Sequence, residues 1–334
     1  MREIRKSCRI IILTVVLIVI FCCFVCCSFQ SSMAKQNVVS VRTLGTATDI
    51  HDIQIDMEYG DVEVYSLSMG LKTLSDQMSM KDISDDEILV EVSDRENVPE
   101  VTMSVTQEGT LQLLETEKRE ENTVENYKVY IYIPDDMQIG TCSVKDKLGD
   151  FSLSGKLVMD SLSVELKTGD FYLDETDSAG RDRGTFGDFY VYTKDGSIYV
   201  ISINVEDSID LLAEDLISVE DADCSGDVSM QSEIGDIIFD GEVQGGFLAS
   251  TETGSIDISG ELDGDISLIG EESSNITLKL NGALENYNYS VSVPNGSILY
   301  NDEGTVSKTL EKDNGADNTI SIKGNGADVS ITFY

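Results

Sequence analysis

The chain has 334 residues and a formal net charge of −39 at pH 7, and hydrophobic residues make up 41% of it. No Lys or Arg occurs between Lys194 and Lys279, a stretch that contains 21 Asp and Glu residues. Because nucleic-acid binding requires basic side chains that neutralise phosphates, this composition excludes a nucleic-acid partner. It favours cations, cationic surfaces or neutral ligands, and it also keeps a long exposed surface soluble.

The N-terminus has the pattern of a membrane anchor. Residues 1–9 form a basic tail, and the run over 10–29 contains no charged side chain. As a helix this run is about 30 Å long, which matches the hydrocarbon core of a bilayer. The pattern predicts a cytoplasmic tail, a single-pass transmembrane signal-anchor helix over 10–29, a linker over 30–37 and an extracellular C-terminal domain at the cell membrane. A cleaved signal peptide is the alternative, because Ser32-Met33-Ala34 offers small residues to the peptidase.

Most of the cysteines lie in or beside this apolar run, which does not suit a disulfide framework. Acylation is an alternative to a role as apolar filler for these five: Cys8, Cys22, Cys23, Cys26 and Cys27. The other two, Cys142 and Cys224, fall on inward positions of expected strands. We expect them to be core thiols without a bridge.

Residues 38–137 read as an N-terminal β region with an irregular insertion. Alternation of apolar and polar residues predicts strands at Val38–Val41, Ile53–Met57, Ile88–Val92, Val101–Val105, Leu111–Leu113 and Tyr127–Ile133. Pro134 stops the last of these strands. The stretch 66–126 is less regular, and Ser75 to Ser84 suits a short helix or a loop.

Residues 138–334 repeat one phrase, which is Gly-Asp or Gly-Ser, an apolar residue, any residue and a second apolar residue. Copies of the phrase, one of them before this region, begin at Gly60, Gly149, Gly169, Gly187, Gly196, Gly226, Gly235, Gly254, Gly264 and Gly296. Within the region, many neighbouring copies are separated by a similar number of residues, which we call the full step, and others by about half that number, the half-step. Such spacing is typical of one supersecondary unit stacked many times with two turns per coil. The sequence therefore predicts an all-β fold, a single-stranded parallel β-solenoid (β-helix) with coils of about 20 residues.

The residue types of the phrase suggest how each turn is built. Glycine tolerates the positive φ of a tight corner, and we expect it there for that reason. The Asp or Ser that follows can hold the turn by hydrogen bonds to local backbone amides. The two apolar residues point to the same side, so Phe151, Phe171, Phe189, Ile237 and Ile266 are predicted core residues.

The Asp residues of successive turns are expected to stack as a ladder, and closely spaced carboxylates can bind a divalent cation. The candidates are Asp150, Asp170, Asp188, Asp227, Asp236 and Asp265. A calcium-binding β-roll is an alternative for the half-step, although such rolls use paired glycines and an Asp two positions beyond the last one. The sequence calls for no cofactor, and Ca²⁺ at the turns stays an open prediction.

The sequence carries no recognisable catalytic signature. His51 is its single histidine, which argues against a metalloprotease with a histidine pair and against a Ser-His-Asp triad. Paired acids of a polysaccharide-active β-helix enzyme are the alternative, because acids are abundant here. Lyases that act on uronic-acid chains also need basic residues, which the long acidic stretch lacks. We therefore predict a protein that is not an enzyme.

Several motifs in order resemble one family. They are the apolar N-terminal segment, Tyr127–Pro134 leading into Leu148-Gly149-Asp150, the repeated Gly-Asp turns and the segment Tyr289–Ile298. The chain is similar in these motifs, over about residues 40–334, to the bacterial putative-adhesin, β-strand-repeat family of unknown function. The resemblance implies a β-solenoid at the bacterial cell envelope, where some relatives sit beside envelope-stress systems. It implies no catalytic residues.

We therefore expect a non-catalytic, membrane-anchored extracellular β-solenoid that acts as an adhesin or as a cell-envelope interaction or stress-related module. Its partner would belong to the envelope, the wall or another surface. Tyr172, Tyr190, Tyr192 and Tyr199 fall on exposed strand positions in consecutive coils. Tyrosines suit contact with sugar or protein. Stacking of these rings across strands, which would stiffen one face, is the alternative.

Overall fold

The protein is described from a computed structural model. Its described residues are 38–46, 50–70, 87–93, 101–115, 127–135, 137–174, 183–272, 274–301, 308–326 and 328–334, of which 38–46, Glu87, Ser93 and Leu284 are described by their backbone only. The predicted anchor helix over 10–29, with its tail and linker, lies outside these residues, as does the segment Ser75–Ser84. Within the described ranges no helix has the length and apolar character needed to cross a membrane. The chain divides into two units, Met1–Val38 and Val39–Tyr334, and the second holds the strands.

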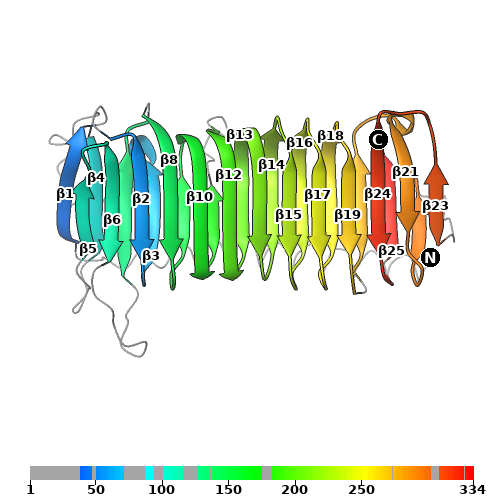
Figure 1. The fold of residues 1–334 in the computed structure, drawn as a ribbon, viewed down its shortest axis with the longest axis horizontal. Helices are drawn as coiled ribbons and strands as arrows, with labels where there is room; N and C mark the ends of the chain where they lie inside the picture. The colour runs from blue at the N-terminus through cyan, green and yellow to red at the C-terminus, as the bar shows by residue number, and fades with distance from the viewer. Residues whose placement is uncertain are drawn as a thin grey trace, which may run out of the picture. The chain divides into compact units, whose positions relative to one another are not determined.

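Two rows of paired strands build the second unit, and β13 (Ile198–Ala213) takes part in both (Figure 1). In order of pairing, the first row contains β5 (Val101–Val105), β6 (Thr110–Glu115), β2 (Asp52–Met57), β8 (Gln138–Asp146), β10 (Val158–Thr168), β12 (Gly184–Asp195), β13, β15 (Val228–Ser232), β17 (Phe247–Thr251), β19 (Ile266–Gly270), β24 (Asn318–Gly324), β21 (Tyr287–Ser292) and β23 (Thr309–Lys312). The second row contains β1 (Val38–Thr46), β4 (Glu87–Ser93), β7 (Lys128–Ile133), β3 (Asp61–Ser66), β9 (Phe151–Ser154), β11 (Phe171–Asp174), β13, β14 (Ile217–Cys224), β16 (Ile237–Val243), β18 (Ile256–Leu262), β20 (Ile276–Leu280), β25 (Asp328–Phe333) and β22 (Ser297–Tyr300). Within the described part of the chain, two short helical segments, α2 (Leu67–Gly70) and η2 (Leu284–Asn286), interrupt the strands.

Successive coils pair in parallel at a nearly constant step along the chain. Phe151 pairs with Phe171, and Ile237 pairs with Ile256. The step is longer from Phe171 to its partner Ile198. The all-β, mainly parallel solenoid is thereby confirmed, and so is its coil length of about 20 residues. Two turns per coil account for the half-step in the sequence.

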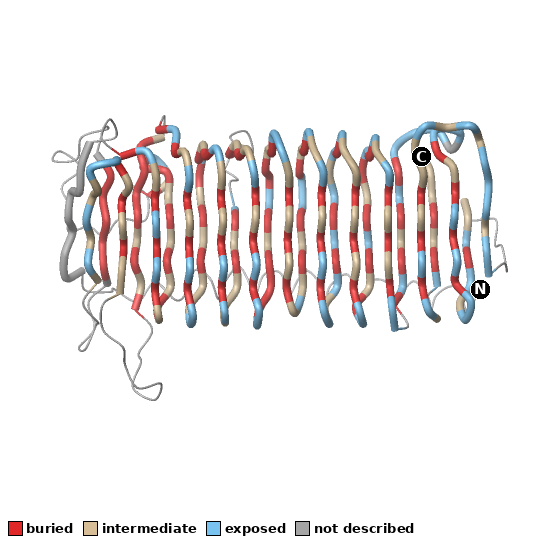
Figure 2. Tube along the Cα trace, viewed as in Figure 1, coloured by how far each residue is buried: buried red, intermediate tan, exposed pale blue. Residues whose placement is uncertain are grey.

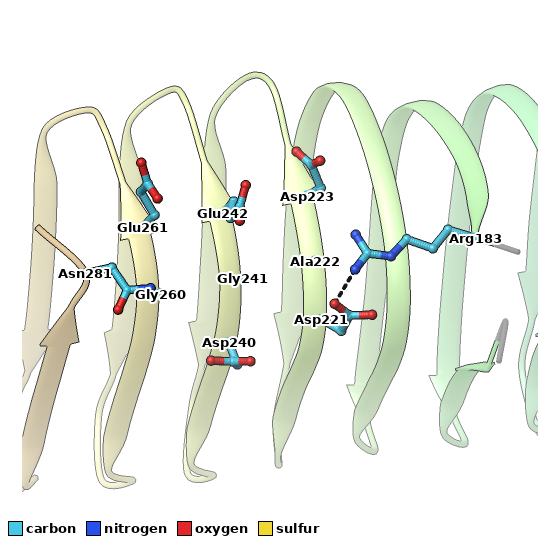
Figure 3. Close-up of a pocket in the computed structure, with 10 residues that line it drawn as sticks. All are labelled: Arg183, Asp221, Ala222, Asp223, Asp240, Gly241, Glu242, Gly260, Glu261 and Asn281. Atoms are coloured by element: carbon cyan, nitrogen blue, oxygen red, sulfur yellow. Dashed lines mark hydrogen bonds and ion pairs between the residues drawn. The ribbon is translucent and has the colours of Figure 1, made fainter. Parts of the chain in front are cut away.

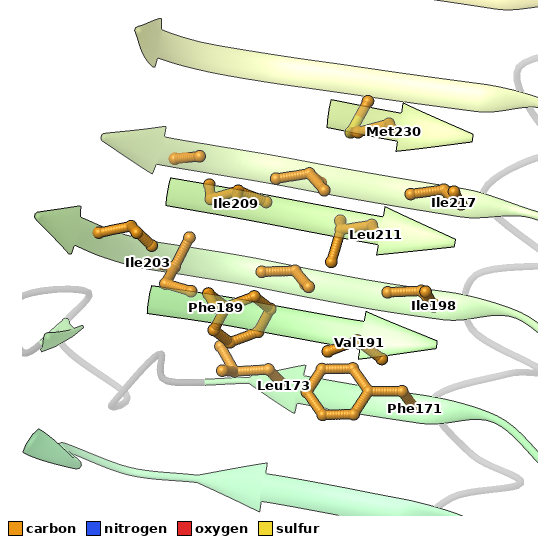
Figure 4. Close-up of a cluster of buried hydrophobic side chains, with 14 of the residues drawn as sticks. Phe171, Leu173, Phe189, Val191, Ile198, Ile203, Ile209, Leu211, Ile217 and Met230 are labelled. Atoms are coloured by element: carbon orange, nitrogen blue, oxygen red, sulfur yellow. The ribbon is translucent and has the colours of Figure 1, made fainter. Parts of the chain in front are cut away.

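The inward side chains of both rows form one hydrophobic core. Burial alternates along most of the strands, as the period of two requires (Figure 2). The five predicted core residues are all inside: Phe151, Phe171 and Ile237 are 0% exposed, and Phe189 and Ile266 are 1% exposed. Phe171 of β11 meets Phe189 of β12 edge-to-face at 5.8 Å between ring centroids, so the two rows interlock at this point (Figure 4).

The predicted core thiols are also confirmed. Cys142 and Cys224 are buried and free. Desolvation raises the pKa of both thiols, to about 12 for Cys142, so the reactive thiolate is disfavoured.

The coil order departs from chain order near both ends of the rows, which the repeat did not predict. The coil of β2 and β3 lies between the coil of β6 and β7 and the coil of β8 and β9. Likewise β24 lies between β19 and β21, and β25 lies between β20 and β22 (Figure 1). Each intercalated coil therefore has its backbone hydrogen bonds satisfied on both sides by segments that are distant in sequence.

Antiparallel strands appear where the rows end. β5 pairs antiparallel with β6, β4 with β7, and β23 with β21. The expectation of a purely parallel stack was therefore wrong at its ends. Each of these antiparallel strands covers an edge of a parallel strand that would otherwise present unpaired N–H and C=O groups, whereas the second row ends with β22 in a parallel pairing with β25.

Glycine has a different role in the turns from the one the sequence suggested. Among the glycines of the repeated phrase, only Gly60 and Gly169 have a left-handed φ, at +99° and +141°. Most of the others are needed because the coils approach each other closely at the turns. A Cβ on Gly226 would stand 1.6 Å from the carbonyl oxygen of Asp207, and one on Gly254 would stand 1.8 Å from that of Gly235. Stacking of backbone on backbone therefore selects glycine at these positions.

Candidate functional site

The acids of the Gly-Asp turns form hydrogen bonds between coils. Asp150 Oδ1 accepts from the amide of Asp170 at 2.9 Å, and Asp170 Oδ1 accepts from the amide of Ser197 at 2.8 Å. The expected bond to local backbone was wrong, because each of these carboxylates reaches the turn of the following coil. The turn acids of successive coils are therefore stacked as predicted, and their hydrogen bonds join neighbouring coils.

Three further candidates repeat this arrangement. Asp227 accepts from the amide of Gly246 at 2.7 Å, Asp236 from that of Ser255 at 2.7 Å, and Asp265 from that of Thr319 at 2.8 Å. Hydrogen bonds of this kind satisfy turn amides that would otherwise lack a partner, so these acids have a structural role.

Asp188 differs from the other candidates. Gly187 and Asp188 lie inside β12 at a register shift rather than at a turn, so the turn predicted there was wrong. The Asp188 carboxylate accepts from the Ser208 hydroxyl at 2.9 Å. The glycine fits the bulge because a Cβ on Gly187 would stand 2.2 Å from the carbonyl oxygen of Asp160.

The turn acids do not converge on one point. Within the described part of the chain, no group of three or more His, Cys, Asp or Glu side chains is placed to hold a metal ion. Burial raises the pKa of Asp150, and the nearby Asp61 and Asp170 carboxylates act in the same direction, against the lowering effect of the bond from the Asp170 amide. The Ca²⁺ prediction at the turns therefore concerns pairs of stacked carboxylates.

The four tyrosines predicted at exposed strand positions are divided between the two rows, and of these Tyr192 is exposed whereas the other three are half-buried. Tyr172 of β11 and Tyr199 of β13 stack at 5.1 Å with an interplanar angle of 3°. Tyr190 and Tyr192 lie on β12 in the other row, where Tyr190 is in register with Ser163 and Asp210. Cross-strand stacking is therefore observed for one pair, and the four rings do not form a single patch.

An open groove crosses β14, β16 and β18 on the outer surface (Figure 3). Its volume is about 230 Å³. Small residues form its floor, because Ala222 is in register with Gly241 and Gly241 with Gly260. A Cβ on Gly260 would stand 1.8 Å from the carbonyl oxygen of Gly241, so close backbone contact keeps this floor free of side chains.

Carboxylates line this acidic groove in register. Asp223, Glu242 and Glu261 succeed one another on β14, β16 and β18, one residue after the floor positions. Neighbouring strands are about 4.8 Å apart, so their charges repel along the row. Asp221 and Asp240 add two further carboxylates on the other side of the floor (Figure 3).

One basic residue lines the acidic groove together with these acids. The Arg183 guanidinium forms an ion pair with Asp221 at one end of the groove, and it also donates to Asn204 Oδ1 at 3.4 Å. Asn281 lines the opposite end. The groove is thus lined by five carboxylates and one guanidinium. This excess of negative charge makes its surface suited to cationic groups.

The acidic groove was not anticipated from the sequence, although a signal is present. Ala222-Asp223, Gly241-Glu242 and Gly260-Glu261 repeat a small residue followed by an acid at a constant interval of one coil. This pattern is hard to tell from the repeated Gly-Asp phrase, which also places an acid after a glycine. The pairs that line the groove differ from the phrase because they fall inside strands, where glycine marks a bulge or a close backbone approach.

The fold is an all-β, mainly parallel β-solenoid that carries an acidic groove on its outer surface. The profile of the Toastrack DUF4097 family matches residues 66–332, and the chain belongs to this family. The family resemblance noted in the sequence is thereby confirmed. No curated protein matches the sequence.

Several crystal structures are similar to this chain. A putative adhesin from Parabacteroides distasonis is 12% identical with a TM-score of 0.47, and the match covers 89% of this chain and 98% of that one. A putative adhesin from Parabacteroides merdae is 11% identical with a TM-score of 0.45, and the match covers 89% and 96%. A putative cell adhesion protein from Clostridium sporogenes is 9% identical with a TM-score of 0.28, and the match covers 90% and 100%.

Proposed function

We propose that this protein is a non-catalytic surface module, an adhesin or cell-envelope interaction protein, that binds a cationic partner through the acidic groove. The observation that carries the proposal is the row of Asp223, Glu242 and Glu261, which are in register on neighbouring strands. Mutual repulsion of these carboxylates is relieved when a cationic group lies over them. The net charge of −39 adds long-range attraction for such a partner.

We further propose that the anchor over residues 10–29 holds this module at the cell membrane with the solenoid outside. The support is the charge asymmetry about that apolar run in the sequence. On this arrangement the partner belongs to the envelope, the wall or another surface.

The non-catalytic part of the proposal is supported by the use of the turn acids. Five of these acids each accept a hydrogen bond from a backbone amide of a neighbouring coil: Asp150, Asp170, Asp227, Asp236 and Asp265. A glycosidase needs two carboxylates held on opposite sides of a sugar bond, one of them able to donate a proton. Turnover of a polysaccharide by the full-length protein, lost on replacement of one acid pair, would contradict the proposal.

The binding proposal is tested with two charge-matched variants of the full-length protein. The first variant carries Asp223→Asn, Glu242→Gln and Glu261→Gln in the acidic groove. The control variant carries substitutions at exposed acids of β2 and β10: Asp56→Asn, Asp160→Asn and Glu165→Gln. Each variant removes three negative charges. The affinity of a lysine-rich peptide is then measured at several salt concentrations.

We expect the groove variant to bind the peptide about tenfold more weakly, a loss of about 1.4 kcal/mol, and the control variant to change affinity by less than about twofold. Equal weakening in both variants would mean that net charge alone attracts the peptide. That result would contradict a site in the acidic groove.

A further inference from the structure

One ladder of inward positions carries short polar side chains beside the turns. Asp146 is in register with Leu166 and Leu166 with Thr193, and Thr193 continues through Ala213 to Ser232 and then Thr251. The polar members of the ladder are buried, and Asp146 itself is 3% exposed. Each of them stands three positions before a turn glycine.

The hydroxyl members donate to a backbone carbonyl of the preceding coil. Thr193 Oγ1 donates to the carbonyl oxygen of Gly169 at 2.7 Å, and Thr251 Oγ1 donates to that of Gly235 at 3.0 Å. Thr251 Oγ1 also accepts from the amide of Gly254 at 3.0 Å. A hydroxyl can do both because it is a donor and an acceptor at once.

Asp146 occupies the same place with a carboxyl group. Its Oδ1 accepts from the amide of Leu148 at 3.0 Å, whereas its Oδ2 is buried without a hydrogen-bond partner. A Cβ on Gly149 would stand 2.1 Å from the carbonyl oxygen of Gly60 and 3.0 Å from Asp146 Oδ2. The corresponding point on Gly196 is 2.1 Å from the carbonyl oxygen of Gly169 and 2.8 Å from Thr193 Oγ1.

Asp146 Oδ2 therefore stands where Thr193 has its hydroxyl, beside a carbonyl oxygen. An ionised carboxylate has no proton to donate, so it would place two acceptors against each other in a buried site. We propose that Asp146 is protonated in the folded protein and donates its Oδ2 proton to the Gly60 carbonyl. Its ionisation at alkaline pH then weakens the junction between the β2–β3 coil and the β8–β9 coil.

The charges around Asp146 favour the neutral acid. Asp61 at the start of β3 and Glu115 at the end of β6 face it with carboxylates. Lys128 of β7 pairs with Asp61 and Glu63, and Lys147 pairs with Glu58, so these cations are engaged.

Among the described residues, β10 on the other flank of Asp146 brings no counter-charge to it. Leu166 of β10 presents an apolar side chain there, and Lys167 is exposed. Burial first, and the Asp61 and Glu115 carboxylates in addition, raise the pKa of Asp146 to about 8.

The sign of the effect follows from proton linkage. An unfolded Asp has a pKa of about 3.9, so between that pH and about 8 the folded state holds a proton that the unfolded state has lost. The stabilisation from this proton is complete below the unfolded pKa and is lost as the pH rises through the folded pKa. Each pH unit within the window raises the unfolding equilibrium constant about tenfold through this one group.

The test is urea unfolding of the full-length protein from about pH 5 to about pH 9, comparing wild type with Asp146→Asn. The Asn side chain keeps the shape and supplies an N–H donor at every pH. We expect the ratio of the wild-type to the variant unfolding constant to rise about tenfold per pH unit up to about pH 8 and then to level off. Asp56→Asn, at an exposed position of the β2–β3 coil, is the control and should give a flat ratio.

A pH-independent ratio for Asp146→Asn would overturn the proposal, because it would mean that Asp146 is already ionised in the folded state. Asp146→Thr, which copies Thr193, provides a second variant with the same expected profile. If both variants fail to fold, infrared spectroscopy of the wild type with ¹³C-labelled aspartate decides. A protonated-carboxyl band of aspartate that persists at neutral pH and is lost above about pH 8 supports the proposal, and the absence of that band at neutral pH overturns it.

Discussion

Neighbouring residues in the turns have separate physical roles. The glycine allows two coils to approach until backbone meets backbone, and the acid that follows it bonds the amide of the next coil. Comparing Gly245 with Gly246 distinguishes a glycine required by close contact between coils from one that is not. A Cβ on Gly245 would stand 2.4 Å from the carbonyl oxygen of Gly226, whereas the nearest atom to a Cβ on Gly246 is Asp227 Oδ1 at 3.4 Å.

We predict that Gly245→Ala destabilises the protein by about 1–3 kcal/mol, because the added methyl group forces two coils apart. Gly246→Ala should change stability by less than about 1 kcal/mol, since the methyl group meets ordinary contacts and also restricts the unfolded chain. Chemical denaturation of the full-length variants measures both values. Equal losses at the two positions would show that coil contact is not what selects glycine.

At the scale of the strand, the two faces differ in burial, and we expect the inner face to contribute more to stability. Phe171 and Tyr172 are neighbours on β11 that point in opposite directions. Phe171 is fully buried and contacts the rings of Phe151 and Phe189, whereas Tyr172 stacks on Tyr199 outside and donates its hydroxyl to Asp170 at 2.8 Å.

Phe171→Ala should cost about 3–5 kcal/mol through lost burial and the cavity left between the two rows. Tyr172→Ala should cost only about 1 kcal/mol, the typical value of a cross-strand aromatic pair. Denaturation midpoints of the two variants test this contrast. A larger loss for Tyr172→Ala would show that the outer tyrosine stack, and not the core, holds these coils together.

The turn ladders lead to a prediction about cations. Stacked carboxylates such as Asp150 and Asp170 repel one another, so millimolar Ca²⁺ or Mg²⁺ should stabilise the folded state. At an ion concentration equal to Kd the gain is about 0.4 kcal/mol, which raises Tm by about 1–2 °C. Differential scanning calorimetry in Ca²⁺ and in chelator, at equal ionic strength, measures the shift. An unchanged Tm would leave the acids purely structural, and folding that requires Ca²⁺ would favour the β-roll.

Much of the fold was predictable because its signals are local. The period of two identified strands such as β7 and β9, and the spacing of Gly-Asp copies indicated the parallel stack and placed Phe151 and Ile237 inside. The coil order at the ends was not predictable, because β2 and β24 pair with strands whose sequences carry the same alternation as any other coil. The acidic groove was not predicted, because its floor depends on a contact between coils that cannot be read from any single segment of the sequence.

At the scale of the whole molecule, a repeated scaffold supports the acidic groove. The coils keep one backbone geometry through β14, β16 and β18, so a residue at one coil position is repeated in space at the next. This regularity turns a few acids into a continuous surface. The same geometry would place any partner against several coils at once, which favours an extended or multivalent cationic ligand.

The most direct test of cationic-partner binding at the cell surface is proximity labelling from the full-length protein in its own cells. The labelling group is fused after Tyr334, and wild type is compared with the charge-matched groove and control variants. We predict capture of an extracellular envelope, wall or surface component that the groove variant loses and the control variant retains. Labelling confined to cytoplasmic proteins, or one captured component retained equally by wild type and both variants, would contradict the proposed function.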